Sequence, residues 1–177
     1  MVNVLGNLFV IASILMLNPL PAISQVKFKV QTKIILSRQN NPGHPANNFS
    51  YILADGRKGQ LYTLDAKYTL LYFYNPECDA CNQYRDLLGK SKAMNDCLKK
   101  DILKVLSIYI DKDTRVWKKH LPEMPGRWIQ GRDDNEYLYK NNVYDLHAIP
   151  TIYLLDRNKK VILKDVLDLR LIEKALK

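Results

Sequence analysis

Two cysteines three positions apart carry the clearest chemical signal in this sequence. Cys78 and Cys81 lie within "YFYNPECDACNQYRDLL", Tyr72 to Leu88, between a continuous apolar run and an amphipathic segment. At this spacing the two sulfurs can form a dithiol that closes to a disulfide, supply half of a metal site, or make a structural cross-link. The segments that flank them indicate how they would be positioned.

The apolar run before the cysteines, Tyr68 to Tyr74, predicts a strand buried on both faces. The segment after them predicts a helix from about Asp79. Cys78 would then lie where strand gives way to helix, beside unpaired N–H groups that stabilise a thiolate together with the helix dipole. Cys81 would lie one turn further on, close to the same sulfur and better shielded. The apolar positions expected on this helix are Tyr84, Leu87 and Leu88.

The metal and structural alternatives are weaker. A zinc site needs a second pair of ligands. Only Cys97, His44, His120 and His147 remain, and no two of them are close in the sequence. A copper site would need a histidine placed by the fold, and His147 is the candidate. A disulfide across two residues closes a very small loop and stabilises little. We therefore predict a redox dithiol and no metal site, with Cys97 as a small apolar residue of a short helix.

The first 24 residues have the features of an export signal. They contain no charged side chain, and the apolar run from Leu8 to Leu17 is followed by small residues at Ala22 and Ser24. No Lys or Arg precedes the run, so cleavage and retention as an anchor both stay open. We predict a signal peptide at residues 1–24 and a periplasmic or other extracytoplasmic location.

Residues 25–48 are predicted to be an N-terminal strand followed by a linker. Alternating apolar and polar residues from Val26 predict the strand, and the stretch Arg38 to Asn48, with two prolines and a glycine, predicts a loop or linker. The main domain is predicted to span residues 49–177.

Within residues 49–177, predicted strands alternate with predicted helices. This order indicates an α/β fold with a central mixed β-sheet flanked by helices. "WIQGRDDN", Trp128 to Asn135, is assigned to packing. The predicted elements are a hairpin around Asp55-Gly56, a helix at Lys92–Lys99, a strand at Ile102–Ile110, helices near Thr114–His120 and Glu136–Val143, two strands within Thr151–Val166, and a final helix capped by Asp168.

Charge and length limit the function classes. The 177 residues carry a net charge of +9, but Lys and Arg are scattered among Asp and Glu. A solvated basic surface is therefore favoured over nucleic-acid binding. We expect a monomer without a cofactor.

The chain resembles the thioredoxin fold and, within it, the exported thioredoxin-like proteins grouped with TlpA and ResA that are common in Bacteroidetes. The resemblance covers Phe49 to Lys177 and rests on "YTLLYFYNPECDAC", the helix that starts at the first cysteine, and "AIPTIYLLDRNKKVI". It implies that Pro150 is cis beside the cysteine pair. It also implies that Ile149 offers backbone hydrogen bonds to an extended substrate segment.

The resemblance further implies a thiol–disulfide oxidoreductase. Cys78 would attack a disulfide in an exported protein, and Cys81 would resolve the mixed disulfide. A membrane protein of the thiol-relay type would then restore the dithiol. The alternatives are a copper-binding chaperone and a non-catalytic binding module.

Three departures from the family pattern bear on this function. Glu77 stands where the family most often has Trp, the dipeptide between the cysteines is Asp79-Ala80, and Tyr72 occupies the position of a buried acid. Negative charge on both sides of Cys78 disfavours its thiolate, which favours a reductase over a strong oxidant. Glu77 is the candidate acid or base for Cys81.

Overall fold

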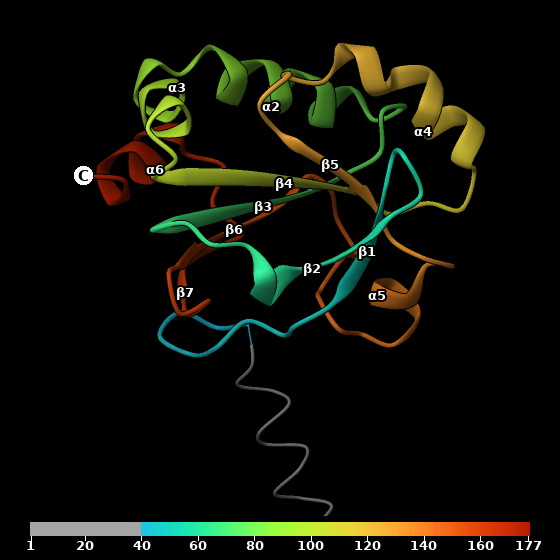
Figure 1. Cartoon of the computed structure of the whole chain (residues 1–177), viewed down its shortest axis with the longest axis horizontal. Helices are drawn as coiled ribbons and strands as arrows, with labels where there is room; N and C mark the ends of the chain where they lie inside the picture. Colours follow the sequence, from blue (N-terminus) through green and yellow to red (C-terminus); the bar gives the residue numbers. More distant parts are fainter. Residues whose placement is uncertain (1–39) are drawn as a thin grey trace, which may run out of the picture. The chain divides into compact units, whose positions relative to one another are not determined.

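The computed structural model describes residues 40–177, so the predicted signal peptide and the strand from Val26 lie outside the described residues. Seven strands of this described part form one mixed sheet in the order β2-β1-β5-β4-β3-β6-β7 (Figure 1). β3 runs parallel to β4, and β4 to β5, while the remaining neighbours are antiparallel. The strands are β1 (Ser50–Leu53), β2 (Lys58–Gln60), β3 (Tyr68–Tyr74), β4 (Leu103–Tyr109), β5 (Ile129–Arg132), β6 (Thr151–Asp156) and β7 (Val161–Lys164).

Helices α2, α3 and α4 all lie on one face of the sheet (Figure 1). Ile172 of α6 and Leu176, which follows the helix, belong to the same apolar cluster as Cys81. A second cluster on the other face includes Leu138 of α5 and Phe49. The helices are α2 (Asp79–Lys90), α3 (Lys92–Lys99), α4 (Thr114–His120), α5 (Tyr137–Lys140) and α6 (Leu169–Ala175), with short 3-10 turns η1 (Leu61–Thr63) and η2 (Leu121–Glu123).

The central strand β3 has the bounds predicted from its apolar run. Leu70 and Tyr72 pack into the cluster on the α2 side, whereas Leu71 and Phe73 pack into the cluster on the α5 side. Because successive strand residues point to opposite faces, a strand with helices or loops on both faces is apolar throughout. β3 ends in the turn that carries Cys78.

The helix starts are capped by side chains. Asp168 accepts from the Arg170 N–H at 3.0 Å, which confirms the predicted cap of α6. Ser91 accepts from the Met94 N–H at 3.2 Å at the start of α3. On α2 the predicted positions Tyr84 and Leu88 are buried, but Leu87 is 45% exposed because the sheet covers only a stripe of the helix.

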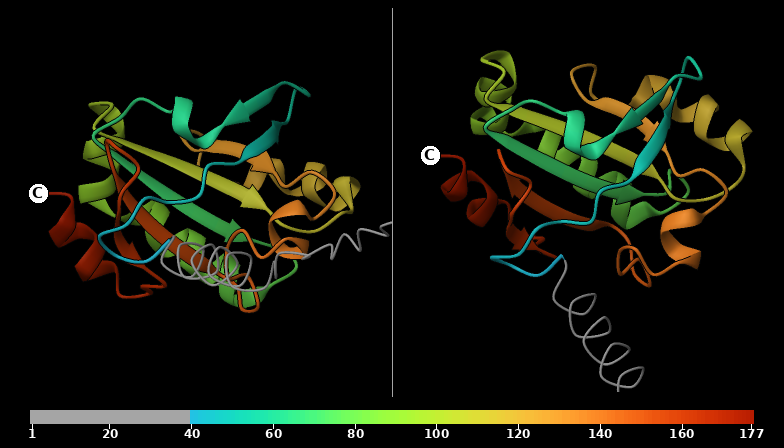
Figure 2. Two further views of the ribbon diagram at one scale, coloured as in Figure 1. Left: turned by 90° about the horizontal axis from the view of Figure 1, so that it is seen from below. Right: turned by 60° about the horizontal axis from the view of Figure 1, so that its bottom comes forward.

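The stretch predicted as a linker packs against the domain over residues 40–48. The side chains of Asn40 and Asn47 both donate to the Val143 carbonyl oxygen, at 2.6 and 2.8 Å. Figures 1 and 2 show this segment crossing the sheet from β7 to β1. Proline, glycine and asparagine indicated irregular backbone correctly. They do not indicate whether that backbone is bound to the rest of the molecule.

The same segment pairs with β7. Gly43 N–H donates to the Val161 carbonyl, and the Val161 N–H donates to the His44 carbonyl, both at 2.9 Å. Pro45 also forms an isolated bridge with Lys160.

α5 is shorter than the predicted helix over residues 136–143. Glu136 and Asn142 have φ angles of 58° and 49°. Since a right-handed helix needs negative φ, these two residues bound the single turn Tyr137–Lys140. Among residues 40–177, none of the helices has both the length and the apolar character needed to cross a bilayer.

Candidate active site

Cys78 lies at the junction of β3 and α2, where it caps the helix. Its backbone is extended, with φ −95° and ψ 111°, and its Sγ accepts the Cys81 N–H at 3.2 Å. The side chain is partly exposed. A sulfur that accepts a helix N–H gains stabilisation when it becomes a thiolate, so the geometry suits a nucleophile.

Cys81 is one turn further along α2 and is fully buried. Burial, and to a smaller extent the neighbouring Cys78, raise the pKa of its thiol to about 12. A thiol in this environment stays protonated at neutral pH and out of reach of a large substrate. Both cysteines are free thiols in this structure. The predicted pair is therefore brought together, with one sulfur reachable and one shielded.

Tyr72 ties the strand to the helix that carries the sulfurs. Its hydroxyl donates to the Cys81 carbonyl oxygen at 2.5 Å. The ring stacks on Tyr74 at a centroid distance of 5.4 Å and meets Trp128 edge-on at 5.7 Å. Burial raises the Tyr72 pKa far above its ordinary value, so the hydroxyl remains a donor. Tyr72 therefore holds the backbone of α2 at Cys81. A buried acid at this position could instead accept the proton of a cysteine.

The turn before Cys78 is held by two asparagines that sequence reasoning did not single out. The Asn75 carbonyl accepts the Cys78 N–H at 3.1 Å, and its Oδ1 accepts the Glu77 N–H at 2.9 Å. Asn82 donates to the Pro76 carbonyl at 2.7 Å. The Asn75-Pro76 dipeptide was the available signal, because Asn-Pro favours turn initiation.

Ile149 and Pro150 lie beside Cys78, and the peptide bond between them is cis, as the resemblance implied. The Cys78 thiol lies 3.9 Å from the Ile149 carbonyl oxygen. Both residues are partly exposed. A partner chain that approaches Cys78 can therefore reach the backbone of the segment leading into β6.

Glu77 is not brought to the sulfur of Cys81. Its side chain is exposed, and among residues 40–177 its carboxylate makes no hydrogen bond to either cysteine. The Glu77 backbone takes part in the turn, but the geometry does not support its side chain as the group that exchanges a proton with Cys81.

The other candidates are dispersed. Cys97 lies on α3, partly buried against the same apolar cluster as Cys81. His147 is exposed, with its ring edge-on to Tyr139 at 5.6 Å. Within the described residues, no three His, Cys, Asp or Glu side chains gather as a metal site would require.

Comparison with known proteins decides the family. A thioredoxin-like family model matches residues 65–161. The chain belongs to the thioredoxin-like family. No curated protein matches it.

Solved structures agree with this assignment. A thioredoxin-like protein from Bacteroides caccae is 39% identical with a TM-score of 0.77, over 88% of this chain and 56% of its own length. The C-terminal domain of an uncharacterized Bacteroides fragilis protein is 44% identical with a TM-score of 0.74, over 77% of this chain and 97% of that one.

A domain of a possible thiol-disulfide isomerase from Cytophaga hutchinsonii is 27% identical with a TM-score of 0.61. It is matched over 77% of this chain and 96% of that one. The thioredoxin-like family, the mixed sheet flanked by helices and the Bacteroidetes-type relatives predicted from the sequence are therefore confirmed, and a general redox role is supported.

Proposed function

We propose that this thioredoxin-like protein is an exported thiol–disulfide oxidoreductase that reduces disulfides in other exported proteins. The observation that carries the proposal is the asymmetry of the cysteine pair. A partly exposed Cys78 accepts a helix N–H, and a fully buried Cys81 supplies that N–H. This arrangement suits two sequential thiol–disulfide exchanges.

In the first exchange the Cys78 thiolate attacks one sulfur of the substrate disulfide. A Cys78–substrate bond forms, the substrate S–S bond breaks, and one substrate thiolate leaves. In the second exchange Cys81 gives up its proton and attacks Cys78 Sγ, which expels the second substrate thiolate, and this thiolate takes up a proton. The substrate gains two electrons, and the protein is left with a Cys78–Cys81 disulfide.

Substrate positioning is assigned to Ile149 and Pro150. An extended segment lying along Ile149 would present its disulfide to Cys78, because the Ile149 carbonyl and the thiol are 3.9 Å apart. A thiol-relay protein in the membrane is the proposed donor that returns two electrons to the disulfide.

The reducing direction is proposed from local charge. Glu77 and Asp79 are both exposed and lie on either side of Cys78. Like charge disfavours a thiolate between them, and strong oxidants are the couples whose reduced thiolate is most stabilised.

The test is the reduction potential of the Cys78–Cys81 couple, titrated against dithiothreitol and glutathione. We expect a value near roughly −270 mV, as for a reducing thioredoxin. Cys81→Ser should accumulate mixed disulfides with exported proteins, because the second exchange is blocked. Cys97→Ser is the matched control and should leave the potential unchanged.

Other results would redirect the assignment. A potential near roughly −120 mV would make the protein an oxidant. A pair that never closes reversibly, together with copper bound one to one, would favour the chaperone. Cysteines that can be replaced without loss of partner binding would favour the non-catalytic module.

A further inference from the structure

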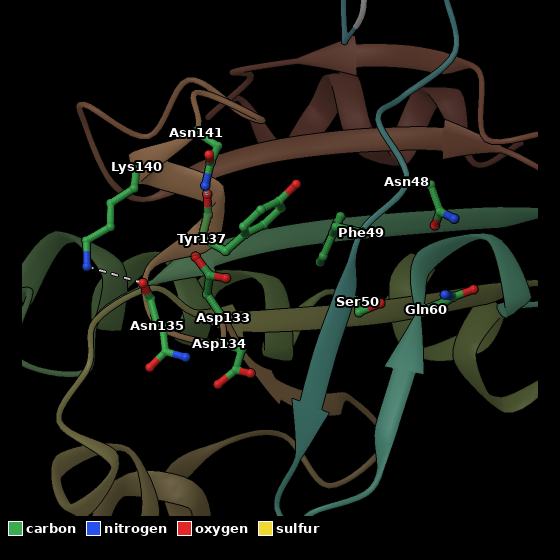
Figure 3. A pocket seen from close by; sticks show the side chains of 10 residues that line it. All are labelled: Asn48, Phe49, Ser50, Gln60, Asp133, Asp134, Asn135, Tyr137, Lys140 and Asn141. Atoms are coloured by element: carbon green, nitrogen blue, oxygen red, sulfur yellow. Dashed lines mark hydrogen bonds between the residues drawn. The ribbon is translucent and has the colours of Figure 1, made fainter.

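A second candidate site lies away from the cysteines, where β1 and the end of β5 separate (Figure 3). It is an open cavity of about 610 Å³ between Ser50 of β1 and Gln60 of β2 on one side and the segment Asp133–Asn141 on the other. β1 pairs with β5 only through Ile52–Arg132 and Leu53–Gly131. The chain then leaves the sheet, and the two segments diverge around the opening.

Asp133 lines this cavity and is 1% exposed. Its Oδ2 accepts the Leu138 N–H at 2.8 Å and so caps the short helix α5. Its Oδ1 is buried and has no hydrogen-bond partner among the described residues. Burying a carboxylate oxygen without a hydrogen-bond partner costs free energy of folding. The capping role explains Oδ2 of Asp133 but not Oδ1.

The other charged groups of the cavity are already neutralised. Asp134 pairs with Arg132 at 3.3 Å. Lys140 pairs with Glu136 at 2.8 Å and also donates to the Asn135 carbonyl, away from Asp133. The uncompensated charge of the cavity is therefore negative and belongs to Asp133.

The remaining lining suits a ligand with N–H donors and an apolar stem. Tyr137 is 54% exposed and lines the same cavity as Asp133 (Figure 3). A cavity lined by both a carboxylate and an aromatic ring suits an organic cation. A bare metal ion is less suitable, since no three His, Cys, Asp or Glu side chains gather within the described part of the chain.

We propose that this cavity binds an organic cation, an alkylammonium or alkylguanidinium group, with Asp133 Oδ1 as the acceptor and Tyr137 as an aromatic wall. The site lies beyond the proposed redox function and does not depend on the cysteines. The cation can come from a free amine or from a Lys or Arg side chain of a protein.

The experiment titrates n-butylammonium and n-butylguanidinium into the protein, with n-butanol as the neutral analogue of equal length. Binding is followed by calorimetry and by the backbone amide NMR signals of the chain. We expect saturable binding of the cations, with shifts centred on Asp133 and Tyr137, and at least tenfold weaker binding of butanol. Asp133→Asn should weaken cation binding at least tenfold, because an amide oxygen still caps Leu138 but carries no charge.

Two further variants keep the test decisive. Asp134→Asn removes the same charge from a carboxylate already paired with Arg132 and should change affinity less than threefold. Ser50→Trp should block the cavity while leaving Asp133 in place. Cys78→Ser should bind as the wild type does, so failure of the redox proposal and failure of this one are distinguishable.

An extended peptide with a central arginine separates the two sources. Binding at least tenfold tighter than butylguanidinium supports a protein side chain, and equal or weaker binding supports a free amine. Equal affinity for butanol, no saturation, unchanged affinity in Asp133→Asn, or binding of Ca²⁺ in place of the organic cations would overturn the proposal.

Discussion

At the scale of residues, two sulfurs on one helical turn are made chemically unequal by their surroundings. Cys78 is partly exposed and accepts a helix N–H, whereas Cys81 is fully buried with a pKa raised to about 12. Reactivity of a thiol requires both access and a thiolate. The structure denies both to Cys81 with respect to reagents in solvent, whereas Cys78 Sγ already lies beside Cys81 on the same helical turn.

This inequality predicts selective alkylation. In the reduced protein, iodoacetamide should modify Cys78 at least a hundredfold faster than Cys81 between pH 7 and pH 9. Within this range a thiol of pKa about 12 is still almost wholly protonated. Peptide mass spectrometry at timed intervals measures both rates. Comparable rates at the two cysteines would show that the shielding of Cys81 is wrong.

The sequence predicted the residues of the site better than their contacts. Cys78, Cys81 and Pro150 are recognisable by type and spacing. The hydroxyl of Tyr72 on the Cys81 carbonyl and the unpaired oxygen of Asp133 are not, because both depend on where a strand ends relative to a neighbouring segment. Glu77 was chosen for its charge and position in the chain, yet its side chain points to solvent.

At the scale of elements, Ser91 joins three helices. Its N–H donates to the Leu88 carbonyl at the end of α2, and its Oγ accepts the Met94 N–H at the start of α3. The same hydroxyl donates to Glu173 of α6 at 2.7 Å. One buried side chain thus fixes the angle at which α2 gives way to α3.

Ser91→Ala should lower the free energy of unfolding by about 1–3 kcal/mol, since it removes a helix cap and a hydrogen bond to a carboxylate. Urea denaturation followed by circular dichroism measures the change. Ser50→Ala, an exposed serine on β1, is the control and should stay within about 0.5 kcal/mol. If Ser91→Ala lowered the free energy of unfolding no more than Ser50→Ala does, Ser91 would not be a stabilising link between the three helices.

Elements with a strong apolar pattern were predicted with their bounds, and elements defined by local backbone geometry were not. β3, α3 and α4 coincide with their predictions. α5 is limited to a single turn by positive φ angles, and β5 is a short strand within a polar stretch. In β5, Gly131 leaves room for the Tyr51 ring, whose Cδ2 would lie 2.9 Å from an added Cβ. The sequence does not show that Gly131 must lack a side chain, because the need arises only from how β1 and β5 pair.

At the scale of the whole molecule, burial of Asp133 makes stability depend on pH. Desolvation raises its pKa from 3.8 to about 6, so the native state binds a proton more tightly than the unfolded chain does. The stability that this proton confers is present below about pH 4 and is lost as pH rises through 6.

Asp133→Asn carries no such titration. Its free energy of unfolding minus that of the wild type should therefore grow by about 1 kcal/mol between pH 5 and pH 8. Urea denaturation of both proteins across this range gives the difference, and other titrating groups cancel in it. A difference that stays flat or shrinks with rising pH would show that the carboxylate is not desolvated.

The pairing of residues 43–46 with β7 has a consequence for self-association. β7 is the last strand on its side of the sheet, and an uncovered edge strand offers its N–H and C=O groups to another chain. Gly43, His44 and Pro45 occupy those groups in the intact protein. A shortened chain beginning at Phe49, where the domain was predicted to start, would expose this edge and become prone to edge-to-edge aggregation. The irregular segment at residues 43–46 thus prevents self-association of the protein through the edge of β7.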